Sequence, residues 1–307
     1  MARQDRLKKG TPGKKGPGES RTSRFGQRPA PDRQKRREPK ERFERPVRRE
    51  EEPRREPRQR SEDTAEYIYG INPVSEALRS GRPLFAIYVL ESAHRNVFGL
   101  IREAEKQRIT IRHAGKDFFE ERFGKGHQGI AAHVARKKML SVSDLPELLA
   151  RAGRGALFLV ADCIEDPRNF GAMLRTAEVA GVHGVIFQQQ RSAGISPAVS
   201  KASAGALEHL SLIETVNIKH ALRILKDAGV KIVGAEAGTD TEPWDLDLKG
   251  PVAVVMGSEG EGLRRTVRDL CDAIVTLPMK GHVTSLNVSV ATGILLYEVL
   301  RQRGRGK

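Results

Sequence analysis

The sequence predicts an α/β protein built around a parallel β-sheet, and three observations lead to that class. Short apolar runs recur through the C-terminal half, separated by stretches with helical periodicity. These runs are apolar at nearly every position, as strands are when helices cover both faces of a parallel sheet. Polar segments that contain glycine follow several of the runs, and ligands of such sheets bind outside the carboxyl ends of the strands.

The larger α/β unit occupies the C-terminal half of the chain. Its strands are expected at residues 156–161, 184–187, 231–235, 251–256 and 273–277. Its helices are expected at residues 169–180, 196–204, 218–228, 261–270 and 286–301. Periodicity gives these spans but reveals no knotted crossover, and knots are so rare that the pattern alone predicts none.

A smaller α/β unit precedes the larger one. Its strands are expected at residues 85–90, 109–112 and 130–134, and its helices at 75–80, 97–107 and 116–123. The predicted organisation is a basic extension at 1–65, a small domain at 66–137, a linker with one helical segment at 138–155, and a large domain at 156–303.

The N-terminal extension carries most of the net charge. Residues 1–60 contain 22 Lys and Arg against 10 Asp and Glu, which gives +12 of the total +15. Only seven of these residues are hydrophobic, too few to offset the entropy lost on folding, so we predict disorder. The charge would attract RNA phosphates non-specifically, and the attraction would weaken as salt rises. A solubilising tail without a target is the alternative.

Several classes of protein are disfavoured by composition. No apolar stretch follows the basic N-terminus to make a signal peptide, and no run approaches the length of a membrane span. Cys163 and Cys271 fall in or beside expected buried strands and indicate no disulfide framework, which fits a reducing cytoplasm. The eight histidines lack metal-ligand spacing, so we expect no metal site.

Three polar segments at expected strand ends are the candidate site. They are residues 166–177, with Asn169 and Arg175; residues 256–263, rich in glycine; and residues 277–291, where Ser285 and Asn287 lie at the entrance of the last helix. Free backbone N–H groups gather at such an entrance. A capping role alone accounts for one of these two side chains but not for both.

The glycine-rich segment has a rival interpretation as a nucleotide-binding turn, since it lies between a strand and a helix. It does not give G-x-G-x-x-G, and Glu259 and Glu261 stand where a pyrophosphate would bind. The negative charge argues against NAD or ATP. A cationic or hydrogen-donating ligand, such as a sulfonium cofactor or a guanosine, is easier to accept.

Taken in order, these segments resemble the motifs of the SpoU family of S-adenosyl-L-methionine (AdoMet)-dependent RNA 2'-O-ribose methyltransferases. The resemblance covers roughly residues 66–302. The matching motifs are Asn169-x-Gly171 with Arg175, Gly257-x-Glu259-Gly260-x-Gly262-Leu263, and Pro278-Met279 through Ser285-Leu286-Asn287-Val288-Ser289-Val290-Ala291. Within the family, the chain is similar to the bacterial enzymes that methylate a guanosine ribose in 23S rRNA.

The resemblance implies further features of fold and assembly. It implies a deep trefoil knot around the cofactor site, a homodimer, and a small domain similar to ribosomal protein L30e that selects the RNA. The segment 126–132 looks like the end of that small domain. For His127 and Gln128 in this segment, a turn that caps a strand is an equally good interpretation.

The resemblance also implies residue roles. Cofactor binding falls to Gly257, Glu259, Gly262, Leu277, Met279, Leu286 and Asn287. The catalytic set is Asn169, Arg175, Glu259, Ser285 and Asn287. Arg175 would bind a phosphate and stabilise the developing alkoxide, rather than act as a literal base, because arginine is hard to deprotonate; an ordinary surface arginine is the alternative. Ser285 would hydrogen-bond the reacting group or cap the helix.

We therefore predict a cytoplasmic, homodimeric, AdoMet-dependent methyltransferase acting on the ribose 2'-hydroxyl of a guanosine in 23S rRNA, free or within an assembling large ribosomal subunit. No membrane or metal partner is expected. One alternative is a tRNA 2'-O-methyltransferase. Another is a catalytically silent RNA-binding factor in ribosome assembly that has kept the fold. The intact polar set favours the enzyme, since a silent relative has no chemical reason to keep these side chains together.

Overall fold

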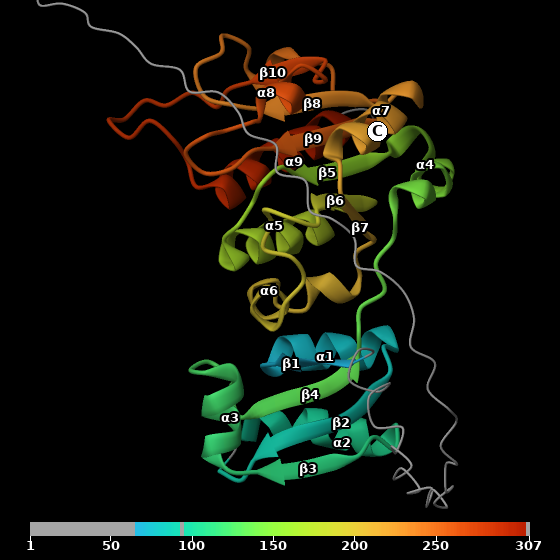
Figure 1. Ribbon diagram of the computed structural model, residues 1–307, viewed down its shortest axis with the longest axis vertical. Coiled ribbons are helices and arrows are strands. Elements are labelled where there is room, and N and C mark those ends of the chain that lie inside the picture. The colour runs from blue at the N-terminus through green and yellow to red at the C-terminus, as the bar shows by residue number, and fades with distance from the viewer. Residues whose placement is uncertain (1–64, 93–94, 305–307) are drawn as a thin grey trace, which may run out of the picture. The chain divides into compact units, whose positions relative to one another are not determined.

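Two β-sheets with their own helices make up the part of the chain that the computed structural model describes, residues 65–92 and 95–304 (Figure 1). The predicted disorder of the basic extension falls almost wholly outside these residues. Within them, no helix combines the length and apolar character needed to cross a membrane.

The first sheet has four strands in the order β1-β4-β2-β3. Its strands are β1 (Ala65–Tyr69), β2 (Leu84–Leu90), β3 (Ile111–Ala114) and β4 (Ile130–Ala135). Its helices are α1 (Ile71–Ser80), α2 (Phe98–Lys106) and α3 (Lys116–Phe123), with a 3-10 turn at Arg95–Val97. Strand β4 pairs antiparallel with both β1 and β2, whereas β2 and β3 are parallel and joined through α2. The βαβ alternation predicted here is therefore present inside a mixed sheet.

The second sheet has six strands, all pairs parallel, in the order β10-β8-β9-β5-β6-β7. Its strands are β5 (Leu157–Ala161), β6 (Gly184–Gln188), β7 (Leu212–Thr215), β8 (Lys231–Ala235), β9 (Val252–Met256) and β10 (Ala273–Val275). Its helices are α4 (Leu145–Ala152), α5 (Pro167–Val179), α6 (Pro197–Ala202), α7 (Ile218–Asp227), α8 (Arg265–Arg268) and α9 (Val288–Gly304). Short 3-10 turns lie at Val142–Asp144, Gly153–Gly155, Ala206–Glu208 and Pro243–Asp245. The predicted parallel-sheet α/β class is confirmed.

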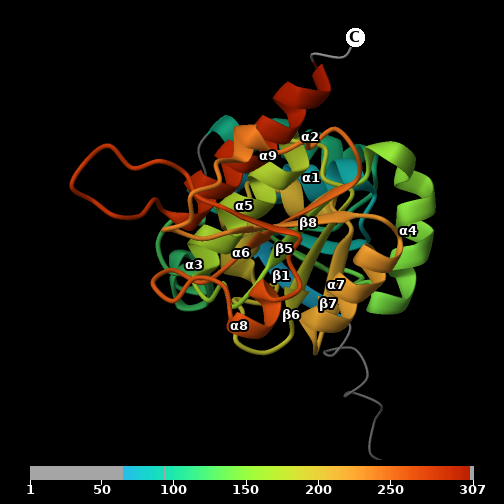
Figure 2. The ribbon, with the colours of Figure 1, turned by 90° about the horizontal axis from the view of Figure 1, so that it is seen from above.

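Helices cover both faces of this sheet, which explains why its strands are apolar throughout. In β5, Leu157 and Leu159 pack into a core shared with α5, α6 and α9, whereas Phe158 and Val160 pack into a core shared with α4, α7 and α8. Figure 2 shows α5 and α9 on one side of the sheet and α4 and α7 on the other. Buried Leu145 ties the predicted linker to the same sheet through α4.

Three local features differ from the expected elements. Strands β1 and β7 were not expected, and both are short strands at sheet edges. Helix α1 begins at Ile71 rather than at 75, because proline fits the first turn of a helix. The helix expected at 261–270 is reduced to the four residues of α8, because the preceding glycine loop folds back on itself.

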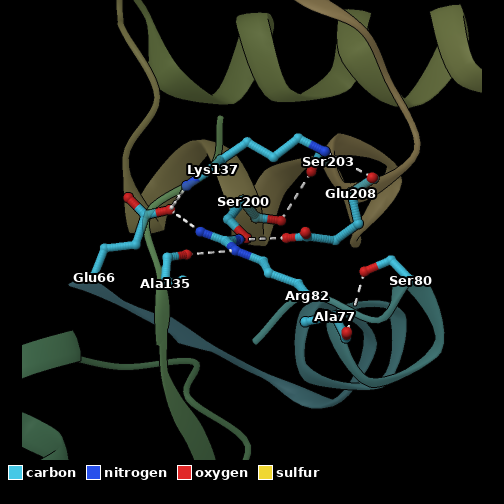
Figure 3. A network of polar contacts seen from close by, with 9 residues as sticks. All are labelled: Glu66, Ala77, Ser80, Arg82, Ala135, Lys137, Ser200, Ser203 and Glu208. Atoms are coloured by element: carbon cyan, nitrogen blue, oxygen red, sulfur yellow. Dashed lines mark hydrogen bonds and ion pairs between the residues drawn. The ribbon is translucent and has the colours of Figure 1, made fainter. Parts of the chain in front are cut away.

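A network of polar contacts joins the first sheet to the segment between α6 and β7 (Figure 3). The Arg82 guanidinium pairs with Glu66, donates to Glu208 Oε1 at 2.7 Å and donates to the Ala135 carbonyl at 2.7 Å. Lys137 Nζ donates to the Glu208 carbonyl at 2.7 Å. The side chains of Arg82 and Glu208 are only 7% and 1% exposed, so this charge cluster is shielded from solvent. Burial lowers the pKa of Lys137.

Gln128 adds a second contact beside this network. Its Oε1 accepts hydrogen bonds from Lys201 Nζ at 2.5 Å and from the Ile71 backbone N–H at 3.1 Å. The neighbouring His127 accepts from the Gly129 N–H at 3.0 Å through its Nδ1. The contacts of both side chains are thus those of a turn that holds the start of α1 and the start of β4.

Candidate active site

The three polar segments follow strands that are close neighbours in the second sheet. Segment 166–177 follows β5, segment 256–263 follows β9, and segment 277–291 follows β10. Strands β8, β9 and β5 are adjacent, and β10 pairs with β8 at the edge. Because parallel strands place their carboxyl ends at one edge of the sheet, the segments converge there.

Asn169, Glu259 and Asn287 form a hydrogen-bonded cluster at this edge. Asn169 Nδ2 donates to Glu259 Oε1 at 2.7 Å, and Asn287 Nδ2 donates to Asn169 Oδ1 at 2.9 Å and to Glu259 Oε1 at 3.0 Å. One residue from each segment therefore meets the other two. The amides orient the carboxylate and leave its second oxygen free of these bonds.

Asn287 also caps the last helix. Its Oδ1 accepts from the Ser289 backbone N–H at 3.0 Å, just before α9 begins at Val288. The Val288 N–H lies 3.4 Å from Glu259 Oε1, so the carboxylate stands at the positive end of the helix dipole. The cap that the sequence left open between Ser285 and Asn287 is made by Asn287.

The glycine loop is closed and tightly packed. The Ser258 and Gly262 backbones exchange two hydrogen bonds of 3.1 Å. A Cβ on Gly257 would lie 2.2 Å from the carbonyl carbon and oxygen of Gly262, so only glycine fits there. Gly260 and Gly262 take φ values of +98° and +68°, which favour glycine. The loop is a rigid backbone wall rather than a phosphate cradle.

A cavity of about 740 Å³ opens between the loops, a size typical of small-molecule sites. It has an apolar side formed by Met256, Leu277, Val288, Ala291 and Leu295, among others. Its predicted members are Gly257, Glu259, Gly262, Leu277, Met279, Ser285, Leu286 and Asn287. All the residues expected to bind the cofactor thus line one cavity.

A second cavity, of about 560 Å³, adjoins the first. The two share the wall formed by Ser258, Glu259, Glu261 and Val288. The remaining lining residues of the second cavity are Cys163, Ile164, Glu165, Asp166, Asn169, Arg191 and Arg264. The amide–carboxylate cluster therefore lies at the boundary between two spaces.

Arg175 and Ser285 lie apart from the cluster. Arg175, on α5, is exposed and lines neither cavity. Asn169 hydrogen-bonds the cluster, and no described contact links it to Arg175. Ser285 is exposed on the wall of the first cavity. The structure thus brings together Asn169, Glu259 and Asn287, but not Arg175, within one chain.

Sequence reasoning missed Asp162 and Arg264. Asp162 is fully buried at the end of β5, and it pairs with the Arg264 guanidinium, whose Nε donates at 2.8 Å. This pair raises the pKa of Arg264. It ties the end of β5 to the segment that follows the glycine loop. A charged residue directly after an apolar strand was the signal that could have identified Asp162.

Two comparisons with protein families match the two sheets. Residues 67–140 match the model described as RNA 2'-O ribose methyltransferase substrate binding. Residues 156–297 match the model described as the SpoU rRNA Methylase family. Among the described residues, no group of three or more His, Cys, Asp or Glu side chains could hold a metal ion.

Curated relatives match over most of the chain. The 23S rRNA (guanosine-2'-O-)-methyltransferase RlmB of Shewanella oneidensis is 41% identical over 239 residues, covering 77% of this chain and 97% of that protein. The protein of the same name from Escherichia coli K12 is 39% identical over 242 residues, covering 78% of this chain and 99% of that protein.

A solved structure shares the fold. The SpoU methyltransferase AviRb from Streptomyces viridochromogenes, crystallised with AdoMet, superposes with a TM-score of 0.67 at 24% identity, over 82% of this chain and 95% of that one. The sheet order, the loops at its carboxyl edge and these matches define the class as an α/β methyltransferase fold with a substrate-binding domain. The chain belongs to the SpoU rRNA methylase family.

Proposed function

We propose that this protein transfers a methyl group from AdoMet to the ribose 2'-hydroxyl of a guanosine in 23S rRNA. The observation that carries the proposal is the cluster of Asn169, Glu259 and Asn287 at the wall between two cavities. Relatives that carry the name 23S rRNA (guanosine-2'-O-)-methyltransferase support the substrate.

The first cavity fits AdoMet. Its volume and apolar side suit an adenosine, and the close backbone wall at Gly257 leaves N–H and C=O groups as ligand contacts. Glu259 and Glu261 line the same space, as does Glu236, which pairs with Arg268 at 3.3 Å; the remaining negative charge favours a cation. Bound AdoMet supplies a methyl group on a positively charged sulfur. Gly257, Leu277, Met279 and Leu286 would hold it, and Asn287 would keep Glu259 in place.

The second cavity is the proposed position of the target nucleotide. It touches the first along Glu259 and contains Asn169, so a ribose there would lie beside the methyl donor. Holding two reactants in a reactive orientation lowers the activation free energy by about 7–11 kcal/mol in well-oriented systems. In this proposal, Asn169 contacts the ribose and Ser285 hydrogen-bonds the reacting group. Attack of the 2'-oxygen on the methyl carbon would break the carbon–sulfur bond and release S-adenosyl-L-homocysteine, while the hydroxyl proton would pass to water.

Arg175 enters the proposal through a homodimer. Arg175 and Val179 are four residues apart on α5, so they share one stripe of the helix. Val179 is 63% exposed, and Val290, Ile294 and Tyr297 form a second exposed stripe on α9. Helices α5 and α9 pack against each other, with Gly293 close to Thr176. An exposed apolar face of this kind fits a second copy, which would bring Arg175 to the partner's site to stabilise the developing alkoxide.

Further parts of the proposal concern organisation. We assign residues 66–137 to RNA selection, 138–155 to the connection and 156–303 to catalysis, in keeping with the two family matches. The trefoil knot of the family is proposed for the segment that leads from β10 into α9. A protein acting on rRNA during large-subunit maturation would work in the cytoplasm, with 23S rRNA or the assembling large ribosomal subunit and a second copy of itself as partners.

The test is methyl transfer itself. The protein is incubated with labelled AdoMet and with 23S rRNA or tRNA transcripts, and any 2'-O-methyl group is mapped by its block to alkaline cleavage. We expect one guanosine of 23S rRNA to be labelled, and a 2'-deoxyguanosine at that position to accept nothing. Label in tRNA alone would favour the tRNA enzyme, and RNA binding without label would favour the silent assembly factor.

The matched variants are Arg175→Ala and Arg168→Ala, two exposed arginines of the same helix. Loss of an electrostatic contact to the transition state costs about 10²–10³ in rate. Arg175→Ala should lose methylation to this extent and keep AdoMet affinity by calorimetry, whereas Arg168→Ala should stay close to wild type. Near-normal turnover of Arg175→Ala would remove this residue from the mechanism.

Sedimentation velocity tests the proposed dimer. Tyr297→Glu should weaken its association.

A further inference from the structure

A continuous layer of aromatic rings covers one face of the first sheet. His133 stacks on Tyr67 with ring centroids 4.7 Å apart, and Phe85 lies 5.3 Å from His133. Tyr67 in turn lies 5.9 Å from Tyr88 and 6.0 Å from Phe123. The rings come from three strands and one helix, so the layer is a product of the folded sheet.

Strand alternation explains how the rings gather on this face. The other face packs on α1 and α2 through Ile68, Ile87, Val89 and Ala132, which form the core of this unit. Their neighbours along each strand therefore point away from that core. Tyr67 pairs with His133, and Tyr88 pairs with both Ala131 and Arg112, in the register of the sheet. Ala131, which is buried on the same face, has a side chain small enough for the rings to pack over it.

Two arginines lie against the rings of this face. Arg112 lies 5.9 Å from the centre of the Tyr88 ring, and Arg122 of α3 lies 4.4 Å from that of Phe118. The four strands, all within the described residues, turn no carboxylate to this face, since Glu66 belongs to the opposite one. Burial and the nearby Arg112 lower the pKa of His133.

Part of the layer is exposed to solvent and does not serve as core. Phe119 is fully buried and serves as core under α3, but Phe85, at an irregularity of β2, is 50% exposed. Arg112, which is also exposed, contacts the Tyr88 hydroxyl of the same layer at 3.4 Å. Proteins that bind single-stranded nucleic acid present exposed rings next to arginines. Each base can stack on a ring while the arginine neutralises a phosphate.

We propose that this aromatic face, with Phe85, Tyr67, His133, Tyr88 and Arg112, binds unpaired nucleotides of the RNA substrate by stacking. The inference rests on the proposed function for the identity of the RNA and adds the part of the RNA that is recognised: a single-stranded segment outside the methylated nucleotide. Sequence preference is weak on such a surface, because every base has a face that can stack.

The test uses the full-length protein with matched pairs of variants. Phe85→Ala and Arg112→Ala change the proposed face. Phe98→Ala and Arg102→Ala remove another exposed phenylalanine and another exposed arginine, both on α2. Phe85→Trp keeps a ring. Fluorescence anisotropy then measures binding to an unstructured RNA of about ten nucleotides and to a duplex of the same length, at about 0.2 M salt to suppress non-specific contacts of the basic extension.

Loss of one stacked base weakens binding by between about fivefold and about 150-fold. We expect Phe85→Ala to weaken single-strand binding at least about fivefold and to raise the KM for rRNA, with kcat and AdoMet affinity unchanged. Phe85→Trp should restore binding, and the duplex should bind weakly throughout. Ultraviolet cross-linking should attach the single strand to peptides of β1, β2 or β4.

Two results would overturn the proposal. One is equal single-strand affinity of Phe85→Ala, Arg112→Ala and the α2 controls. The other is a defect seen only with ribosomal particles and not with naked RNA, which would make the face a protein-docking surface. Failure of the proposed function has a different signature, because a protein that methylates no RNA could still bind single strands in a Phe85-dependent manner.

Discussion

Asn287 has two separable roles, and their separation gives a quantitative prediction. Its Oδ1 caps α9 through the Ser289 N–H, while its Nδ2 donates to Asn169 and Glu259. Asn287→Ala removes all three contacts. Loss of a cap costs about 1 kcal/mol, which for a protein of this size lowers the Tm by roughly 2–4 °C.

Asn287→Ser separates the two roles. Serine caps a helix about as well as asparagine, but its hydroxyl is too short to reach Asn169 and Glu259. Two hydrogen bonds that hold an exposed carboxylate contribute about 1 kcal/mol in total, or about fivefold in affinity. We therefore expect both variants to bind AdoMet about fivefold more weakly, and Asn287→Ala to melt at a lower temperature than Asn287→Ser.

Isothermal titration calorimetry measures the affinity, and thermal unfolding followed by circular dichroism measures the Tm. Wild-type AdoMet affinity in Asn287→Ser would refute the view that the amide positions Glu259 for the cofactor. An equal drop in Tm in the two variants would refute the capping role.

Three other predictions concern packing and burial. Gly257→Ala should abolish AdoMet binding in calorimetry because its Cβ would meet backbone at 2.2 Å, whereas Gly281→Ala, which has open space, should bind normally. Arg82→Ala should lower the free energy of unfolding in urea by about 3 kcal/mol, since it leaves buried carboxylate charge uncompensated, whereas exposed Arg79→Ala should cost less than about 1 kcal/mol. Burial raises the pKa of Cys271 to about 12, so its alkylation by iodoacetamide at pH 8, mapped by mass spectrometry, should be at least about tenfold slower than in the denatured chain.

Much of the fold follows from local pattern. The expected strand 231–235 and the expected helix 116–123 coincide with β8 and α3, because each is a clear apolar run or a stretch of helical residues with glycine at its ends. Strands β1 and β7 were missed because they are short edge strands, whose formation depends on a neighbouring strand more than on their own sequence. The shortened α8 likewise reflects the closed Ser258–Gly262 loop.

The candidate site was predicted as three segments rather than as a geometry. The residue types and the rule that ligands bind at strand ends identified Asn169, Glu259 and Asn287 as candidates. Their hydrogen bonds join positions 90, 118 and 28 residues apart. No local pattern fixes such contacts, since they depend on which strands become neighbours. The six-residue spacing from Asn169 to Arg175 predicts that the two side chains do not share one face of the helix, and the structure places Arg175 away from the cluster in its own chain.

The sequence by itself determined the α/β class, the polar loops and the glycines that only a tight turn explains, because these follow from side-chain chemistry and backbone preference over a few residues. The tertiary structure decided the strand order, the meeting of Asn169 with Glu259 and Asn287, and the aromatic face of the first sheet. These features depend on contacts between residues far apart in the chain, and only the packing of the whole sheet and its helices selects among the possible pairings.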